Sequence, residues 1–173
     1  LKEEPQRVEA ADPDNKTFFS IMPSDVKAEL EDVKNKWRQK DEVNSEFPLR
    51  LAVRRLRDTL NSACIELPSI KQRTPVNYAY INARTMQSIA VDDNQQIKII
   101  SDHGEIQVVA KTDDTVRDDV VSISHGFGVL PSIQDYEKHG ANTNLLISSD
   151  RDVESINAMP RMTGIPIKIS TML

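Results

Sequence analysis

Arginine occupies positions 54, 55 and 57, directly after a segment typical of a strand. The planar guanidinium group matches the oxygens of phosphate and carboxylate groups. Asn61 and Ser62 follow and add uncharged donors and acceptors. We interpret this segment as an anion-binding loop, most suited to phosphate. The alternative is a solvated loop in which Asp58 pairs with one of the arginines.

A second segment, Ser124-His125-Gly126-Phe127-Gly128, also follows an expected strand. Its two glycines let the backbone approach a ligand closely, and His125 could donate a hydrogen bond or transfer a proton. No serine and aspartate stand nearby to complete a catalytic triad, and no second histidine or cysteine has metal-ligand spacing. We therefore reject a hydrolase site and a zinc site, and a purely structural histidine remains the alternative.

Two further loops are polar. The segment 140–146 contains Asn144, whose amide could recognise the edge of a heterocycle, although such residues also shape turns. The segment 157–166 contains Arg161 and Thr163, which could meet an anion or simply form a turn. No P-loop or dinucleotide fingerprint is present, and no motif could perform catalysis by itself. If one end of a barrel gathers all four loops, they form a ligand-holding rim.

Short strands separated by turn residues must position these loops. The expected strands are 47–53, 97–100, 106–110, 120–124 and 165–169, with a turn at 102–104 and a short helix at 83–88. This pattern favours a β-barrel or a sandwich.

The N-terminal part of the chain differs from the rest in its composition and in the spacing of its apolar residues. Residues 1–14 are polar and indicate a linker, and 41–46 indicate a polar connector. Between them, Val26, Leu30, Val33 and Trp37 have the spacing of an amphipathic helix from about residue 25 to 40, with Ser24 as its N-cap. The chain starts with leucine, which suggests a piece of a longer polypeptide. We therefore expect residues 1–46 to lead from an upstream region into a domain at 47–173.

Composition restricts the function further. The 173 residues carry a net charge of -5 and only 5% aromatic residues, which disfavours nucleic-acid binding. No apolar run approaches the roughly 18 residues that span a bilayer. The single cysteine, Cys64, cannot form an internal disulfide and is expected to be a small buried hydrophobe.

In this order, the segments resemble the dinucleotide-binding C-terminal domain of molybdopterin oxidoreductases, a family that includes formate dehydrogenases, nitrate reductases and dimethyl sulfoxide reductases. The resemblance covers about Phe47 to Met172. It rests on the arginine loop ending in Asn-Ser, on residues 77–83, on the strand and His-Gly-aromatic-Gly of 120–128, on the Thr-Asn-x-Leu of 140–146, and on 159–169.

The resemblance implies a mainly β fold, a double-psi β-barrel with short helices, which closes over a bis(molybdopterin guanine dinucleotide) cofactor carrying molybdenum or tungsten. Upstream domains of the same polypeptide would supply the metal ligand, the substrate funnel and any iron–sulfur cluster, and an electron-transfer subunit could be a partner. Carried over by position, the implied cofactor contacts are Arg54, Arg55, Thr59, Leu60 (through its backbone), Asn61, Ser62, His125, Gly126, Asn144, Met162 and Thr163.

The chain departs from the family pattern at four places. Val53-Arg54 replaces a common Thr-Gly, and Thr85 stands at a usual aspartate position, where a side-chain contact to the nucleotide is therefore not expected. Asn94 lies in a turn that is usually Asp-Gly-Asp and can adopt a left-handed backbone. Asp119 replaces a glycine.

The leading hypothesis is therefore a cofactor-binding domain of a molybdenum or tungsten oxidoreductase, inactive as an isolated chain because the cofactor performs the chemistry. The first alternative is a non-catalytic double-psi barrel used for protein interaction or assembly, since a fold does not dictate a function. A nucleic-acid-binding barrel is the second alternative. A cytoplasmic location is the default expectation.

Overall fold

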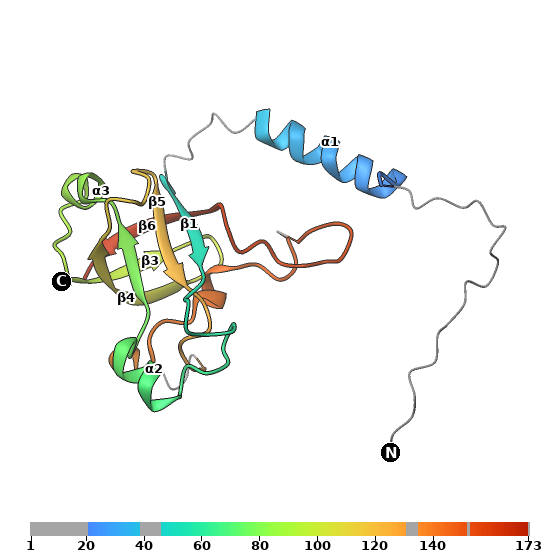
Figure 1. The fold of residues 1–173 in the computed structure, drawn as a ribbon. Coiled ribbons are helices and arrows are strands. Elements are labelled where there is room, and N and C mark those ends of the chain that lie inside the picture. Colours follow the sequence, from blue (N-terminus) through green and yellow to red (C-terminus); the bar gives the residue numbers. More distant parts are fainter. Residues whose placement is uncertain (1–20, 39–45, 131–134, 152, 173) are drawn as a thin grey trace, which may run out of the picture.

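The computed structural model describes residues 21–38, 46–130, 135–151 and 153–172. Within these residues, six strands close into a barrel in the spatial order β1-β5-β2-β4-β3-β6 (Figure 1). Along the chain they are β1 (Leu49–Arg54), β2 (Tyr78–Ile81), β3 (Gln96–Ile100), β4 (Glu105–Thr112), β5 (Val120–Ser124) and β6 (Ile165–Thr171). The expected mainly β barrel is confirmed.

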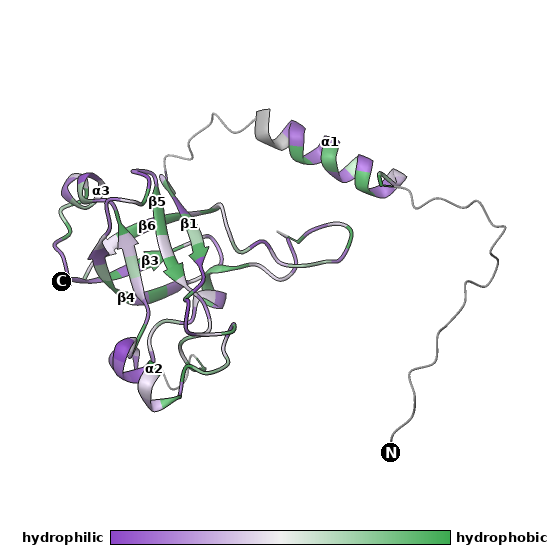
Figure 2. Cartoon of the chain, viewed as in Figure 1, coloured by the Kyte–Doolittle hydropathy of each residue, from purple (hydrophilic) through white to green (hydrophobic). Residues whose placement is uncertain are grey.

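Alternation of apolar and polar residues explains why these segments form barrel strands. In β3, Ile97 and Ile99 are buried while their neighbours are partly exposed, and β4 alternates in the same way. Successive side chains of a strand point to opposite faces. β3 and β4 therefore contribute one face to the interior, and Figure 2 shows the mixture of hydrophilic and hydrophobic colours along the strands.

The topology combines parallel and antiparallel neighbours. β1 runs parallel to β5, and β2 runs parallel to β4, while the other four pairings are antiparallel. Parallel neighbours require long crossover connections, and here the chain forms β2, β3 and β4 between β1 and β5, and α3 and β3 between β2 and β4. Two parallel pairs within a closed six-stranded barrel agree with the double-psi β-barrel that the resemblance implies.

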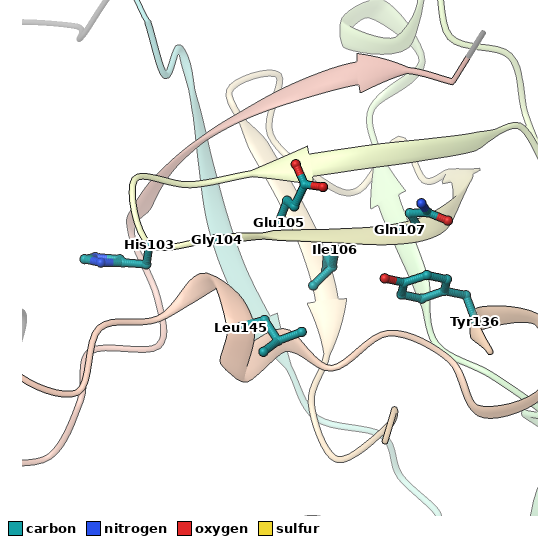
Figure 3. Close-up of a pocket in the computed structure, with 7 residues that line it drawn as sticks. All are labelled: His103, Gly104, Glu105, Ile106, Gln107, Tyr136 and Leu145. Carbon is teal, nitrogen blue, oxygen red and sulfur yellow. The ribbon is translucent and has the colours of Figure 1, made fainter. Parts of the chain in front are cut away.

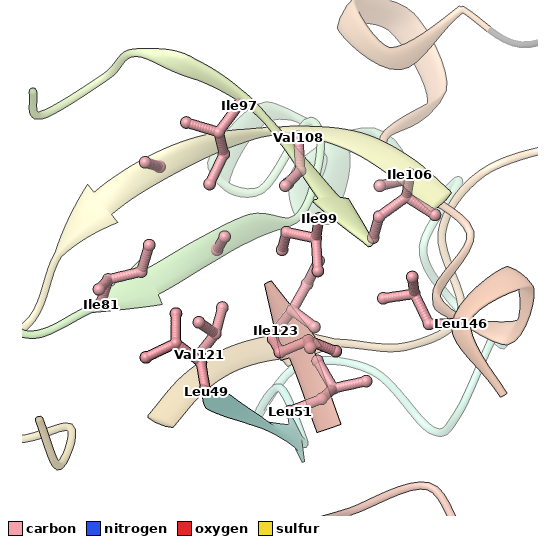
Figure 4. Close-up of a cluster of buried hydrophobic side chains, with 14 of the residues drawn as sticks. Leu49, Leu51, Ile81, Ile97, Ile99, Ile106, Val108, Val121, Ile123 and Leu146 are labelled. Carbon is pink, nitrogen blue, oxygen red and sulfur yellow. The ribbon is translucent and has the colours of Figure 1, made fainter. Parts of the chain in front are cut away.

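Aliphatic side chains form a buried cluster inside the barrel (Figure 4). Leu51, Ile81, Ile99 and Ile123 have no exposed surface, and Leu146 closes one end of the interior. A barrel of this size encloses just enough room for its own side chains. The interior is therefore a core, and any ligand must bind at an end or on the outer surface.

Strand direction places the polar loops at one end of the barrel. β1 and β5 are paired with Arg54 opposite Ser124, so the loops after both strands start at the same end. β6 begins there because it is antiparallel to β1, with Ile165 opposite Leu51. Helix α2 (Pro68–Arg73) lies at this end in Figure 1, and α3 (Ala83–Ser88) lies at the opposite end. We call the end of the barrel that carries α2 and the loops after β1 and β5 the loop end.

The short helices follow local signals only in part. Helix α3 begins after Asn82, whose side chain accepts a hydrogen bond from the Arg84 amide, and its bounds match the prediction. Helix α2 was not predicted. Two further short helices, α4 (Tyr136–His139) and the 3-10 helix η2 (Thr143–Leu146), lie in the crossover after β5.

Helix α1 (Ser24–Arg38) confirms the predicted N-terminal helix. Ser24 is its first residue and not its N-cap, because the Lys27 amide already donates to the Pro23 carbonyl. Leu30 and Val33 are exposed. The linker 1–14, the connector 41–45 and the side chain of Trp37 lie outside the described residues. Among the described residues, no helix has the length and apolarity needed to cross a membrane.

The barrel core makes a direct stability prediction. Ile123→Ala should lower the free energy of unfolding by about 2–5 kcal/mol, because it leaves a cavity in a fully buried position. Met159→Ala is the control, since this side chain is 62% exposed, and should change stability by less than about 0.5 kcal/mol. Urea unfolding followed by circular dichroism measures both. Equal losses would contradict the assignment of the core.

Candidate functional site

Asn61 joins two of the predicted loops. It occupies the tight turn between Leu60 and Ala63, with a left-handed backbone (φ 55°). Its side-chain Oδ1 accepts a hydrogen bond from Arg55 Nη1 at 2.5 Å and lies 3.3 Å from His125 Nε2. The loop after β1 and the loop after β5 therefore meet on one amide oxygen.

Gly126 lets the same two loops come into backbone contact. Its φ is +92°, and a Cβ atom there would lie 2.8 Å from the Asn61 carbonyl oxygen and 3.2 Å from the Ser62 Cα. A side chain would therefore need both a strained backbone and a displacement of the arginine loop. This close approach is what a glycine next to His125 makes possible.

Asn77 connects this cluster to the loop that carries Asn144. It is buried at the start of β2, and its Nδ2 donates to the carbonyls of Ser124 and Ala141 at 2.7 and 2.9 Å. Its Oδ1 accepts from the Ala141 amide at 2.7 Å. Sequence reasoning did not select Asn77 as a site residue, because its partners are 47 and 64 residues away.

The Asn144 loop is held against the barrel by backbone contacts. Asn142 caps η2 by accepting from the Asn144 amide at 3.1 Å. Gly104, in the turn between β3 and β4, packs so closely that a Cβ there would lie 2.5 Å from the Leu145 carbonyl oxygen. Asn144 itself is exposed on this supported helix, so its amide is available to a ligand.

Asn144 and Met162 line one cavity of about 270 Å³, together with Ile147, Ser148, Ser149 and Pro160. Thr163, the residue after Met162, accepts a hydrogen bond from the Val53 amide at 3.4 Å. The Gly164 amide donates to the Leu51 carbonyl at 2.7 Å. The loop before β6 is thus fastened to β1 at the loop end, with Met162 turned toward the Asn144 loop.

Arg54 is oriented differently from Arg55. Its guanidinium group lies over the Tyr80 ring at 4.1 Å and donates to Ser122 Oγ and to Asp113 at 2.9 and 3.0 Å. The side chain therefore runs along the outer face of β5 and β2, away from the loop end. Hydrogen bonds from the Thr115 hydroxyl and from Arg54 hold the pKa of the Asp113 carboxyl below its ordinary value.

The remaining predicted residues lie in the same turn. Thr59 is half-buried, while Leu60 and Ser62 are exposed. Leu60 uses its backbone within the turn, where its amide and carbonyl bond to Ala63 at 3.3 and 2.9 Å. The structure therefore brings Arg55, Asn61, Ser62, His125 and Gly126 together directly.

Two expectations at single residues need comment. Cys64 is exposed, so its expected burial is wrong; it follows the Asn61 turn with a φ of 72°, and the buried apolar residue of this loop is its neighbour Ile65. Thr85 is buried on α3, and its hydroxyl donates to the Asp118 carbonyl. It lies on α3, at the opposite end of the barrel from the loop end.

A larger cavity of about 370 Å³ lies beside the start of β4 (Figure 3). Gly104, Glu105, Ile106 and Gln107 form its floor, with Leu145 of η2 and Tyr136 of α4 on the other side. Burial raises the pKa of Tyr136. His103 at its edge contacts Asp102 at 3.0 Å and Arg151 at 2.8 Å. None of the predicted cofactor contacts lines this cavity.

Comparison with known proteins decides the family. Residues 49–166 match the family described as the molydopterin dinucleotide binding domain. The chain belongs to this family. The match begins with β1, extends to the start of β6, and contains every predicted contact residue. The suspected resemblance is confirmed.

The fold is similar to part of a much larger solved protein. Acetylene hydratase from Pelobacter acetylenicus superimposes with a TM-score of 0.64 over 76% of this chain, at 21% sequence identity. The match spans only 19% of that protein. At this identity the likeness is one of fold. No curated protein sequence matches significantly.

The residues at the loop end fit a dinucleotide. Arg55 offers an exposed cation that suits pyrophosphate oxygens, and the loop after β5 lies beside the arginine loop because Gly126 lets the two loops meet. His125 Nδ1 and Thr143 Oγ1 are buried without a hydrogen-bond partner. Buried polar atoms of this kind are unfavourable unless something pairs with them, and a heterocycle carries the donors and acceptors to do so.

The close approach at Gly126 can be tested by stability. Gly126→Ala should destabilise the domain more than Gly164→Ala, although both glycines have a positive φ (+92° and +80°). A methyl group added at Gly164 would have no atom within 4 Å, so that variant carries backbone strain alone, about 1–2 kcal/mol. Thermal unfolding of both variants makes the comparison. Equal losses would show that the two loops do not touch at Gly126.

The lowered pKa of Asp113 predicts a pH dependence. A carboxyl with a lowered pKa in the folded state stabilises the fold above its ordinary pKa, and this contribution is lost as pH falls through the lowered pKa. Asp113→Asn should therefore be less stable than the unsubstituted chain at pH 7 and lose less stability as the pH falls below about 4. Asp118→Asn, an exposed carboxylate, is the control. Parallel curves of stability against pH for Asp113→Asn and the unsubstituted chain would contradict the role of this carboxyl.

Proposed function

We propose that this chain is the cofactor-clasping C-terminal domain of a molybdenum or tungsten oxidoreductase. The observation that carries the proposal is that Arg55 and His125 both contact the side-chain amide oxygen of Asn61 at the end of the barrel. The small share of acetylene hydratase that the fold covers supports the idea of further domains in the parent protein. On this proposal, residues 47–173 form the binding domain and 1–46 lead into it.

Each loop would hold a different part of the cofactor. Arg55 would bind the pyrophosphate through charge-assisted hydrogen bonds. His125 and Gly126 would lie against the pterin, and Gly126 would keep the loop after β5 packed against the Asn61 turn. Asn144, Met162 and Thr163 would close over the heterocycle from the other side, since Asn144 and Met162 already line one cavity.

The turn at residues 59–62 would form the edge between these parts. Thr59, Leu60, Asn61 and Ser62 would line the cofactor there. Arg54 is proposed to contribute indirectly, because Asp113 and Ser122 already bind its guanidinium group. When bound, the cofactor supplies the metal that performs two-electron redox chemistry, while the domain binds, orients and shields it.

The parent protein is proposed to carry two such dinucleotides around one metal ion, with any iron–sulfur cluster in another domain and an electron-transfer subunit as a partner. The choice of molybdenum or tungsten would be made by residues outside this chain. The rival hypothesis, an assembly module without cofactor, would be favoured by a parent protein that contains neither metal nor guanine nucleotide.

The full-length parent should contain about one molybdenum or tungsten atom and about two guanine nucleotides per chain. Arg55→Ala and Asn144→Ala should each lower cofactor retention about tenfold or more, since each removes hydrogen bonds to the ligand, charged ones in the case of arginine. Metal is measured by mass spectrometry, and nucleotide is released by acid and quantified.

Arg117→Ala is the matched control. It removes the same charge from an exposed side chain at the opposite end of the barrel, where Arg117 pairs with Asp119. Retention should stay at the parental level. Absence of both metal and nucleotide from the parent, in a host shown to make the cofactor, would contradict the proposal.

A further inference from the structure

The side-chain amide of Asn61 can be oriented from its neighbours. Arginine has only hydrogen-bond donors, so the Asn61 atom that lies 2.5 Å from Arg55 Nη1 must be the oxygen. The same oxygen lies 3.3 Å from His125 Nε2. An amide oxygen accepts and cannot donate, and it has two lone pairs for its two neighbours.

This assignment determines the tautomer of His125. Nε2 must carry a proton in order to donate to Oδ1, so in the neutral ring Nδ1 carries none and presents a lone pair. Nδ1 is buried and has no partner among the described residues. One amide oxygen therefore sets both the direction of the Arg55 guanidinium group and the donor and acceptor pattern of the His125 ring.

Asn61 is itself held in place by its backbone. It lies in the turn closed by the Leu60–Ala63 hydrogen bonds, and its carbonyl oxygen packs against Gly126. Its φ of 55° is tolerated best by glycine, asparagine and aspartate. A residue that is fixed at the backbone and saturated at its oxygen is suited to orient others.

We propose that Asn61 is a positioning residue, which acts on the ligand through Arg55 and His125 and not through a decisive contact of its own. The inference rests on the proposed function, because it assigns the ligand of this same site a phosphate that meets Arg55 and a heterocyclic N–H that His125 Nδ1 accepts. It refines the direct contact that the resemblance implies for Asn61.

Two substitutions separate the amide oxygen from the backbone conformation. Asn61→Gly keeps the left-handed turn accessible and removes the acceptor. Asn61→Asp keeps an acceptor at the same place and also tolerates the turn. Circular dichroism melting of both variants verifies that the 173-residue chain still folds. The pair therefore tests the acceptor and not the turn.

The first measurement needs no ligand. Nitrogen-15 NMR of the histidine rings, at about pH 8 where histidine is mostly neutral, should show Nε2 protonated in His125 of the parent chain. Asn61→Gly should raise the Nδ1-protonated population several-fold, and Asn61→Asp should restore the parental tautomer. His103 and His139 are internal references, and His125→Gln assigns the signal. An unchanged tautomer in Asn61→Gly would overturn the proposal.

The second measurement uses guanosine diphosphate as the probe, titrated by calorimetry. Asn61→Gly should weaken binding of the probe about tenfold in the otherwise unsubstituted 173-residue chain. In a chain that already carries Arg55→Ala and His125→Gln, it should weaken binding less than about twofold, because the effects of substitutions at residues that act through one another are not additive. Full additivity would show a direct contact and overturn the proposal. If the unsubstituted chain does not bind guanosine diphosphate, the proposed function fails in this chain. The tautomer measurement then still decides the role of Asn61.

Discussion

Parallel pairing of β1 with β5 places Arg54 opposite Ser124, and the two loops that form the centre of the site both leave from that pair. An antiparallel pairing would send the two loops to opposite ends of the barrel. His125 could then not reach Asn61, which lies in the same loop as Arg55. The remaining elements reinforce this arrangement. Asn77 fastens the end of β5 to the Asn144 loop, and the Gly164 amide fastens the loop before β6 to β1.

The arginines of the described residues differ in whether a carboxylate neutralises them. Arg54, Arg73 and Arg117 each pair with an aspartate. In the part of the chain that the structure describes, Arg55 binds a neutral amide and no carboxylate. A neutral partner orients a guanidinium group without cancelling its charge, so this acidic chain retains a local attraction for anions.

Sequence patterns predicted the features that depend on neighbouring residues. Helix α3 and strand β5 agree at both ends, because a cap and an apolar run are local signals. Features that depend on distant partners were missed. Asn77 showed no local sign of its role, and α2 has no apolar period. Arg54 and Arg55 could not be separated, because β1 extends through Arg54 and turns its side chain toward Asp113, which is 59 residues away.

Strand β6 has a consequence for how a new polypeptide acquires its ligand. It is the last strand in order, and it pairs with both β1 and β3, so the barrel remains an open sheet until residues 165–171 have been synthesised. Met162 and Thr163 lie directly before this closing strand, so they are synthesised shortly before it. Until then the chain would expose unpaired strand edges and an incomplete rim, which favours ligand binding after β6 has paired and gives chaperones a defined intermediate to protect.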